Sequence, residues 1–197
     1  MKNFAKLFSL FGLLIILSCA SNIRSKTYTN DDFNNFKTFA YLPNTNFNVE
    51  DFNSAEDKSI EASLIATMND KMVEKGFSID TSNPDLLVLL STSNEIKSNL
   101  QNTRNSYEQA PSGGTSSGGS SPNYASVSST DYKRYFSSSE DALYNKPYKN
   151  GTLIVQVFSK ASKELVWVGM AENFKAHISD QTLMTRMISE IFNEFPI

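Results

Sequence analysis

The sequence contains a single cysteine and a single histidine among its 197 residues. One cysteine excludes a disulfide within the chain and any metal site built from several thiolates, and one histidine excludes a zinc site with paired histidines. The 18 basic and 21 acidic residues give a formal net charge of −3, a poor match for the phosphates of nucleic acid. We therefore expect no cofactor, no metal and no nucleic-acid partner.

Residues 1–18 have the pattern of a secretory signal peptide. Lys2 and Lys6 supply its positive start, and the run from Leu7 to Leu17 is predominantly apolar. Eleven helical residues rise about 16 Å, too short for the roughly 30 Å hydrocarbon core of a bilayer. The run is therefore interpreted as a leader rather than a permanent membrane span.

The leader ends in Ile16-Leu17-Ser18-Cys19, which resembles the lipobox of bacterial lipoproteins. The pattern is an aliphatic residue, a tolerant position, a small residue that exposes the scissile bond, and a thiol that accepts a diacylglyceryl group. The alternative is that Cys19 is an ordinary apolar residue at the end of a signal peptide or membrane anchor. The lipobox is favoured because the chain's only cysteine stands where the motif requires it.

Lipidation at Cys19 predicts attachment to the bacterial cell envelope. One acyl chain holds a protein to a membrane only marginally, whereas two or more hold it firmly. Loss of Lys2 and Lys6 with the leader would change the formal net charge from −3 to −5. Neither Ala20 nor Ser21 is an aspartate. By analogy with the sorting rule of enteric bacteria, this favours the outer membrane, facing the periplasm.

The mature chain is predicted to form an α+β domain. Residues 19–35 are polar and without periodicity, which is typical of a lipidated N-terminus followed by a tether, and residues 36–197 are expected to form one domain. Apolar periodicity and turn signals predict strands at 36–42, 77–80, 86–93, 152–159 and 164–171, and helices ending at Gly76 and near Pro196. This order predicts a two-layer α/β sandwich with a mixed or mainly antiparallel sheet and two helices packed on one face.

A Gly/Ser-rich loop at 101–147 interrupts the predicted domain, and several aromatic residues lie in it. Loop aromatics can stack on sugars or peptides, or they can pin the loop to the domain. In the last predicted strand, Trp167 is expected to share one sheet face with Leu165 and Gly169. The candidate ligand-contact aromatics are Tyr124, Tyr132, Tyr135 and Trp167.

The sequence contains few groups suited to catalysis. The only thiol belongs to the lipobox, and His177 has no Gly-x-Ser-x-Gly nucleophile elbow to serve. Asp85 and Glu172 lie at predicted strand ends and could form a carboxylate pair of the glycosidase type, although their spacing does not distinguish them from the other acids. We therefore predict no catalytic residue and no enzyme.

Several segments together resemble the lipoprotein family known as domain of unknown function 4136. They are FKTFAYLP, a helix ending in KGF, NPDLLVLL, GTLIVQVFSKASKELVWVGMAE and the terminal IFNEFP, which span roughly residues 33–196. The resemblance implies a secreted, lipid-anchored bacterial domain with a two-layer α/β fold. It implies no activity, and the Ser-rich loop departs from shorter relatives.

These observations predict a non-enzymatic envelope lipoprotein, tethered to the membrane through its lipid, that binds an envelope protein or a glycan. It would use its sheet face, its sheet edge or its aromatic loop. One alternative is an envelope hydrolase that acts through acidic residues such as Asp85 and Glu172. Another is a purely structural periplasmic lipoprotein whose Gly/Ser loop is a spacer.

Overall fold

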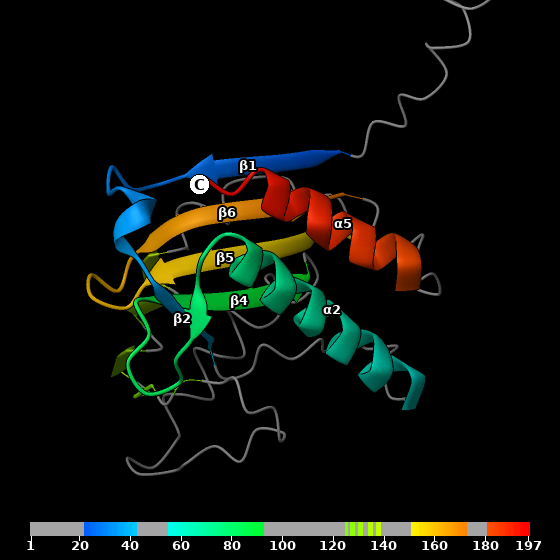
Figure 1. Ribbon diagram of the computed structural model, residues 1–197, viewed down its shortest axis with the longest axis horizontal. Helices are drawn as coiled ribbons and strands as arrows, with labels where there is room; N and C mark the ends of the chain where they lie inside the picture. The colour runs from blue at the N-terminus through cyan, green and yellow to red at the C-terminus, as the bar shows by residue number, and fades with distance from the viewer. Residues whose placement is uncertain are drawn as a thin grey trace, which may run out of the picture.

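The computed structural model of the chain describes residues 22–42, 55–92, 151–172 and 181–197, together with individual residues between 125 and 138 (Figure 1). These residues form a mixed six-stranded sheet in the order β1-β6-β5-β4-β2-β3. The strands are β1 (Ile23–Thr27), β2 (Thr38–Tyr41), β3 (Ser78–Ile79), β4 (Leu86–Thr92), β5 (Leu153–Ser159) and β6 (Leu165–Ala171). The neighbouring pairs β1–β6, β6–β5 and β5–β4 are antiparallel, whereas β2 is parallel to both β4 and β3.

Two helices cover one face of this sheet, as predicted (Figure 1). They are α2 (Ala55–Glu74) and α5 (Gln181–Asn193). The buried stripes repeat at helical spacing, which is why each helix turns one side to the sheet. They consist of Leu64, Ile65, Met68 and Met72 on α2 and Met184, Met187, Ile188, Ile191 and Phe192 on α5.

Helix α2 ends in a Schellman motif at the predicted glycine. Gly76 has φ of 91°, its N–H donates to the carbonyl of Val73 at 2.9 Å, and the N–H of Phe77 donates to the carbonyl of Met72 at 3.0 Å. The left-handed backbone favours glycine because it has no Cβ. Phe77 then enters the core beside Met72.

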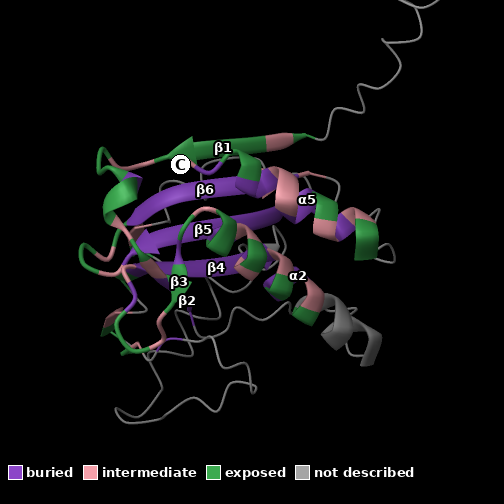
Figure 2. Ribbon diagram, viewed as in Figure 1, coloured by how far each residue is buried: buried purple, intermediate pink, exposed green. Residues whose placement is uncertain are grey.

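The sheet is buried on both faces, which explains the continuous apolar run of β4. Leu86, Val88 and Leu90 lie in the core beneath the helices, and Leu87 and Leu89 lie in a second core on the opposite face. Figure 2 shows β4, β5 and β6 as buried and most of β1 as exposed. We call the two sides the helix face and the back face.

The predicted tether at 19–35 is wrong for residues 23–27, which form the edge strand β1. Ile23 pairs with Ala171 and Thr27 with Trp167 along β6. Apart from half-buried Ile23, the side chains of β1 are exposed, so backbone pairing rather than an apolar pattern defines the strand. Phe33 is also buried, with its ring 5.3 Å from that of Phe195. The domain therefore begins well before residue 36.

A β-bulge in β6 overturns one predicted side-chain arrangement. Val157 pairs with Trp167 but Phe158 pairs with Leu165, so Val166 is an extra residue on β6. As a result Leu165 lies in the back-face core and Trp167 in the helix-face core, not on one shared face.

Candidate functional site

Strand β1 begins at one end of the sheet, and we call this end of the sheet the proximal end. Here the N–H of Glu172 donates to the carbonyl of Asn22 at 3.3 Å, and Arg24 Nη2 lies 3.4 Å from Glu172 Oε1. The register places the start of β1, the end of β6 and the start of β5 together at this end. Cys19 and the signal peptide lie outside the described residues, and the chain from Cys19 to Asn22 contains only Ala20 and Ser21.

The structure buries Tyr135, which was expected to contact a ligand. The side chain has 0% exposure and its ring meets that of Phe158 edge to face at 5.5 Å in the back-face core. Lys163 Nζ donates to the Tyr135 hydroxyl at 3.3 Å and lies 3.7 Å from Asp131 Oδ2. Burial, with a smaller effect from the Asp131 carboxylate, raises the pKa of Tyr135 to about 12. In this position Tyr135 fastens the loop to the sheet.

Further backbone contacts hold the described part of the loop on the back face. Ser138 Oγ donates to the carbonyl of Tyr135 at 2.8 Å and accepts from the N–H of Leu165 at 3.2 Å. The N–H of Ala125 donates to the carbonyl of Tyr41 at 2.9 Å. These described loop residues therefore contribute to the back-face core, and the Gly/Ser-rich stretch at 111–122 lies outside the described residues. Tyr124 and Tyr132 lie outside the described residues.

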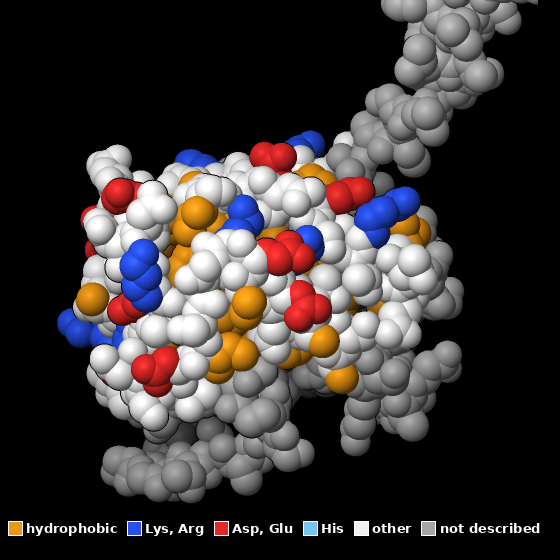
Figure 3. Space-filling view, viewed as in Figure 1, with side chains coloured by type: hydrophobic (Ala, Val, Ile, Leu, Met, Phe, Trp, Pro, Cys, Tyr) orange, Lys and Arg blue, Asp and Glu red, His pale blue; other side chains and the backbone are white. Residues whose placement is uncertain are grey.

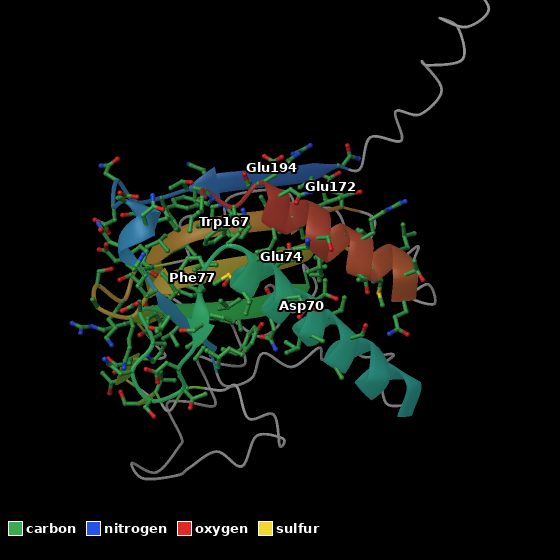
Figure 4. All side chains as sticks on the ribbon, viewed as in Figure 1. Asp70, Glu74, Phe77, Trp167, Glu172 and Glu194 are labelled. Carbon is green, nitrogen blue, oxygen red and sulfur yellow. The ribbon has the colours of Figure 1, made fainter. Side chains whose placement is uncertain are left out.

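Trp167 is also buried, so its expected contact with a ligand is wrong for this structure. Its side chain, which is labelled in Figure 4, has 0% exposure. Its ring centroid lies 4.9 Å from that of Phe195 and 6.1 Å from that of Phe192. The indole Nε1 is buried and has no hydrogen-bond partner. The ring is therefore a packing element of the helix-face core.

The structure separates the two candidate acids of a hydrolase. Asp85 directly precedes β4 and Glu172 directly follows β6, and β4 and β6 are each antiparallel to β5. The two residues therefore lie at opposite ends of the sheet. Seven-residue strands are about 23 Å long, well beyond the separation of a glycosidase pair. His177 lies outside the described residues.

Asp85 has a structural role that its sequence position alone did not reveal. Its Oδ2 accepts hydrogen bonds from the N–H groups of Lys37 at 2.8 Å and Thr38 at 3.0 Å, and its own N–H donates to Thr38 Oγ1 at 2.9 Å. Partial burial acts to raise the pKa of Asp85, but these hydrogen bonds outweigh it and hold the pKa below 3.8. The carboxylate links the start of β2 to the start of β4.

Two buried polar atoms on the back face were missed by the sequence analysis. Gln156 is 2% exposed and its Oε1 has no partner, and Ser91 Oγ is likewise buried without one. Ser91 pairs with Ile154 and Gln156 with Leu89, so the two residues are diagonal neighbours. A glutamine in the middle of the apolar stretch LIVQVFS was the available signal.

The part of the chain that the structure describes offers neither a metal site nor a membrane-spanning helix. It contains no group of three or more His, Cys, Asp or Glu side chains that could hold a metal ion. Its helices are also too short or too polar to cross a bilayer.

The fold and its two cores define an α+β sandwich domain. Residues 24–197 match the family described as a domain of unknown function (DUF4136), and the chain belongs to that family. No curated protein matches the chain.

Two solved structures share some similarity with this chain. A PDZ domain protein from Parabacteroides distasonis is 15% identical with a TM-score of 0.36, and the match covers 85% of this chain. This chain spans only 35% of that protein. A PelC dodecamer from Paraburkholderia phytofirmans is 8% identical with a TM-score of 0.39, over 87% of this chain and 93% of that one.

Proposed function

We propose that this protein is a non-enzymatic lipoprotein of the bacterial envelope, a binding or assembly module held to the membrane through Cys19. One observation carries the proposal: only Ala20 and Ser21 separate the lipobox-like Ile16-Leu17-Ser18-Cys19 from Asn22, the first residue that the structure describes. Acylation of this thiol would make Cys19 the lipidated N-terminus of the mature domain. The proposed location is the outer membrane, on the side that faces the periplasm.

The arrangement of the acids supports a binding role over hydrolysis. The Asp85 carboxylate accepts hydrogen bonds from two backbone N–H groups, and the Glu172 carboxylate forms an ion pair with Arg24. The two acids lie at opposite ends of the sheet. Each carboxylate therefore has a partner that stabilises the fold, and the pair is too far apart to act on one bond.

Fewer parts of the sheet are exposed to a partner than we expected from the sequence. Both sheet faces are buried by the helices and by the loop residues around Tyr135, which leaves the edge strand β1 as an exposed part of the sheet. On the face that Figure 3 shows, acidic and basic side chains are interspersed, in keeping with the ion pairs Lys71–Glu74 and Arg186–Glu190. We propose an envelope protein or glycan as the partner, met at the β1 edge or at the loop tyrosines Tyr124 and Tyr132.

Metabolic labelling tests the proposed anchor. Cells expressing the wild type, Cys19→Ala or Ser21→Ala are grown with an alkyne-tagged palmitate, and the purified proteins are compared for incorporated label. The wild type and the Ser21→Ala control should be labelled and recovered with membranes, and Cys19→Ala should be unlabelled. Equal labelling of Cys19→Ala, or an unlabelled wild type, would overturn the proposal.

A further inference from the structure

We infer that the domain lies on the lipid surface in a fixed orientation, with its proximal end nearest the bilayer, rather than moving freely on a tether. This inference rests on the proposed lipid at Cys19. It follows from where the sheet begins, because residues 23–27 are a strand and not a linker.

The reach of the chain limits how far the domain can move from the anchor. The carbonyl of Asn22 accepts a hydrogen bond from the N–H of Glu172, so the chain is already tied to the end of β6 at residue 22. Three residue steps from Cys19 to Asn22 span at most about 11 Å when fully extended. The sheet itself is longer, because seven-residue strands such as β5 extend about 23 Å.

The two ends of the domain are therefore distinguishable. The proximal end also carries the start of α5, at Gln181 (Figure 1). The opposite, distal end carries the turn between β5 and β6, in which Ala161 and Ser162 are exposed. A lipid within about 11 Å of Asn22 brings the first end to the headgroups and leaves the second in water.

One exposed cation at the proximal end, Arg24, suits a phospholipid surface. The Arg24 side chain is 68% exposed and follows Asn22 by two residues. An arginine at this level can donate hydrogen bonds to headgroup phosphates while keeping its ion pair with Glu172. The occupant of this surface is therefore a lipid headgroup layer.

Two single-thiol variants test this orientation. Acylation consumes the thiol of Cys19, the only cysteine of the chain, so an introduced cysteine is the only reactive thiol of the lipidated protein. Thr182→Cys places a probe on the exposed first turn of α5, and Ala161→Cys places one on the exposed distal turn. Gln181→Cys replaces the first variant if that one does not fold.

The lipidated variants are labelled with a thiol-reactive fluorophore and reconstituted into phosphatidylethanolamine and phosphatidylglycerol vesicles that contain a headgroup nitroxide lipid. The probe at 182 should lose most of its fluorescence and the probe at 161 should retain it. Equal quenching of the two probes would overturn the inference while leaving the lipid anchor intact. Absence of palmitate on the wild type would instead remove the proposed function itself.

A matched linker variant separates reach from any intrinsic affinity of the domain for lipid. Insertion of about 20 Gly and Ser residues between Ser21 and Asn22 adds a coil with a root-mean-square span of about 25 Å, comparable to the length of the sheet. The probe at 182 should regain fluorescence in this variant. Persistent quenching at 182 with the long linker would show that the orientation does not come from the short connection, and would overturn this account.

Discussion

The indole ring of Trp167 lies across Gly169, two residues further along β6. A Cβ built at residue 169 would collide with Trp167 Cη2, lie 2.8 Å from Trp167 Cζ2 and lie 2.5 Å from Ile191 Cγ2. Glycine is therefore required here by the close approach of the ring and of α5, not by its backbone conformation. The largest side chain of the helix-face core depends on the smallest residue of its own strand.

Gly169→Ala should lower the free energy of unfolding by about 1–3 kcal/mol, the usual cost of overpacking a core. Urea unfolding followed by circular dichroism measures the change. Trp167→Phe removes Cζ2 and Cη2 of the indole, so Gly169→Ala should be less damaging in that background. Strictly additive effects of the two substitutions would contradict the proposed contact between residues 167 and 169.

Gly76→Ala provides a contrasting case, because open space surrounds its position. No atom lies within 4 Å of a Cβ built there, but φ is +91°. The expected loss is about 1 kcal/mol from the left-handed backbone alone, and Gly76→Asn should lose less because asparagine tolerates this region better. Equal losses for alanine and asparagine in urea unfolding would argue against a conformational origin.

The elements with a clear apolar period were predicted to within a few residues. The strands expected at 152–159 and 164–171 are observed as Leu153–Ser159 and Leu165–Ala171, because alternation and continuous apolar runs reflect burial directly. Strand β1 was missed for the same reason: the segment IRSKT exposes most of its side chains and is defined by hydrogen bonds to β6, which lies some 145 residues further along the chain.

The roles of the candidate site residues could not be obtained from local sequence. The burial of Tyr135 depends on Phe158 and Lys163, more than 20 residues away, and nothing near Tyr135 indicates that contact. The separation of Asp85 from Glu172 is a property of strand order and direction. The bulge at Val166 likewise depends on how two strands pair, so the side of the sheet that Leu165 faces could not be derived from alternation.

Asp85→Asn should change how stability depends on pH in acid. The pKa of Asp85 is lowered in the folded protein, so its contribution to stability is present above its ordinary pKa of 3.8 and is lost as the pH falls below that value toward the folded pKa. The variant should be less stable than the wild type at neutral pH and should lose less stability on acidification through that window.

Urea unfolding at a series of pH values from neutral to acid measures this difference. Asp31→Asn, at an exposed position before η2 (Phe33–Asn35), is the matched control and should leave the acid slope close to that of the wild type. The pKa values of Asp32 and Asp80 are also lowered, mainly by hydrogen bonds from nearby backbone N–H groups, so part of the slope should remain in Asp85→Asn. An unchanged slope in Asp85→Asn would mean that its links to Lys37 and Thr38 do not form.

Tyr135→Phe should instead change how the free energy of unfolding depends on pH in alkaline solution. The pKa of Tyr135 is raised to about 12, so the folded protein retains the phenolic proton while the unfolded chain begins to lose it above its ordinary pKa of 10.0. Stability that is fully present below pH 10.0 should therefore fall as the pH rises toward about 12. The phenylalanine variant has no such proton and should show a shallower decline.

The same position tests whether the loop belongs to the back-face core. Tyr135→Phe keeps the ring against Phe158 and loses only the hydrogen bond from Lys163, a change of about 1 kcal/mol in the free energy of unfolding. Tyr135→Ala removes the ring and should lose about 3–5 kcal/mol. Urea unfolding of the two variants gives the comparison. Equal stability of the alanine and phenylalanine variants would show that the back-face core does not depend on the Tyr135 ring.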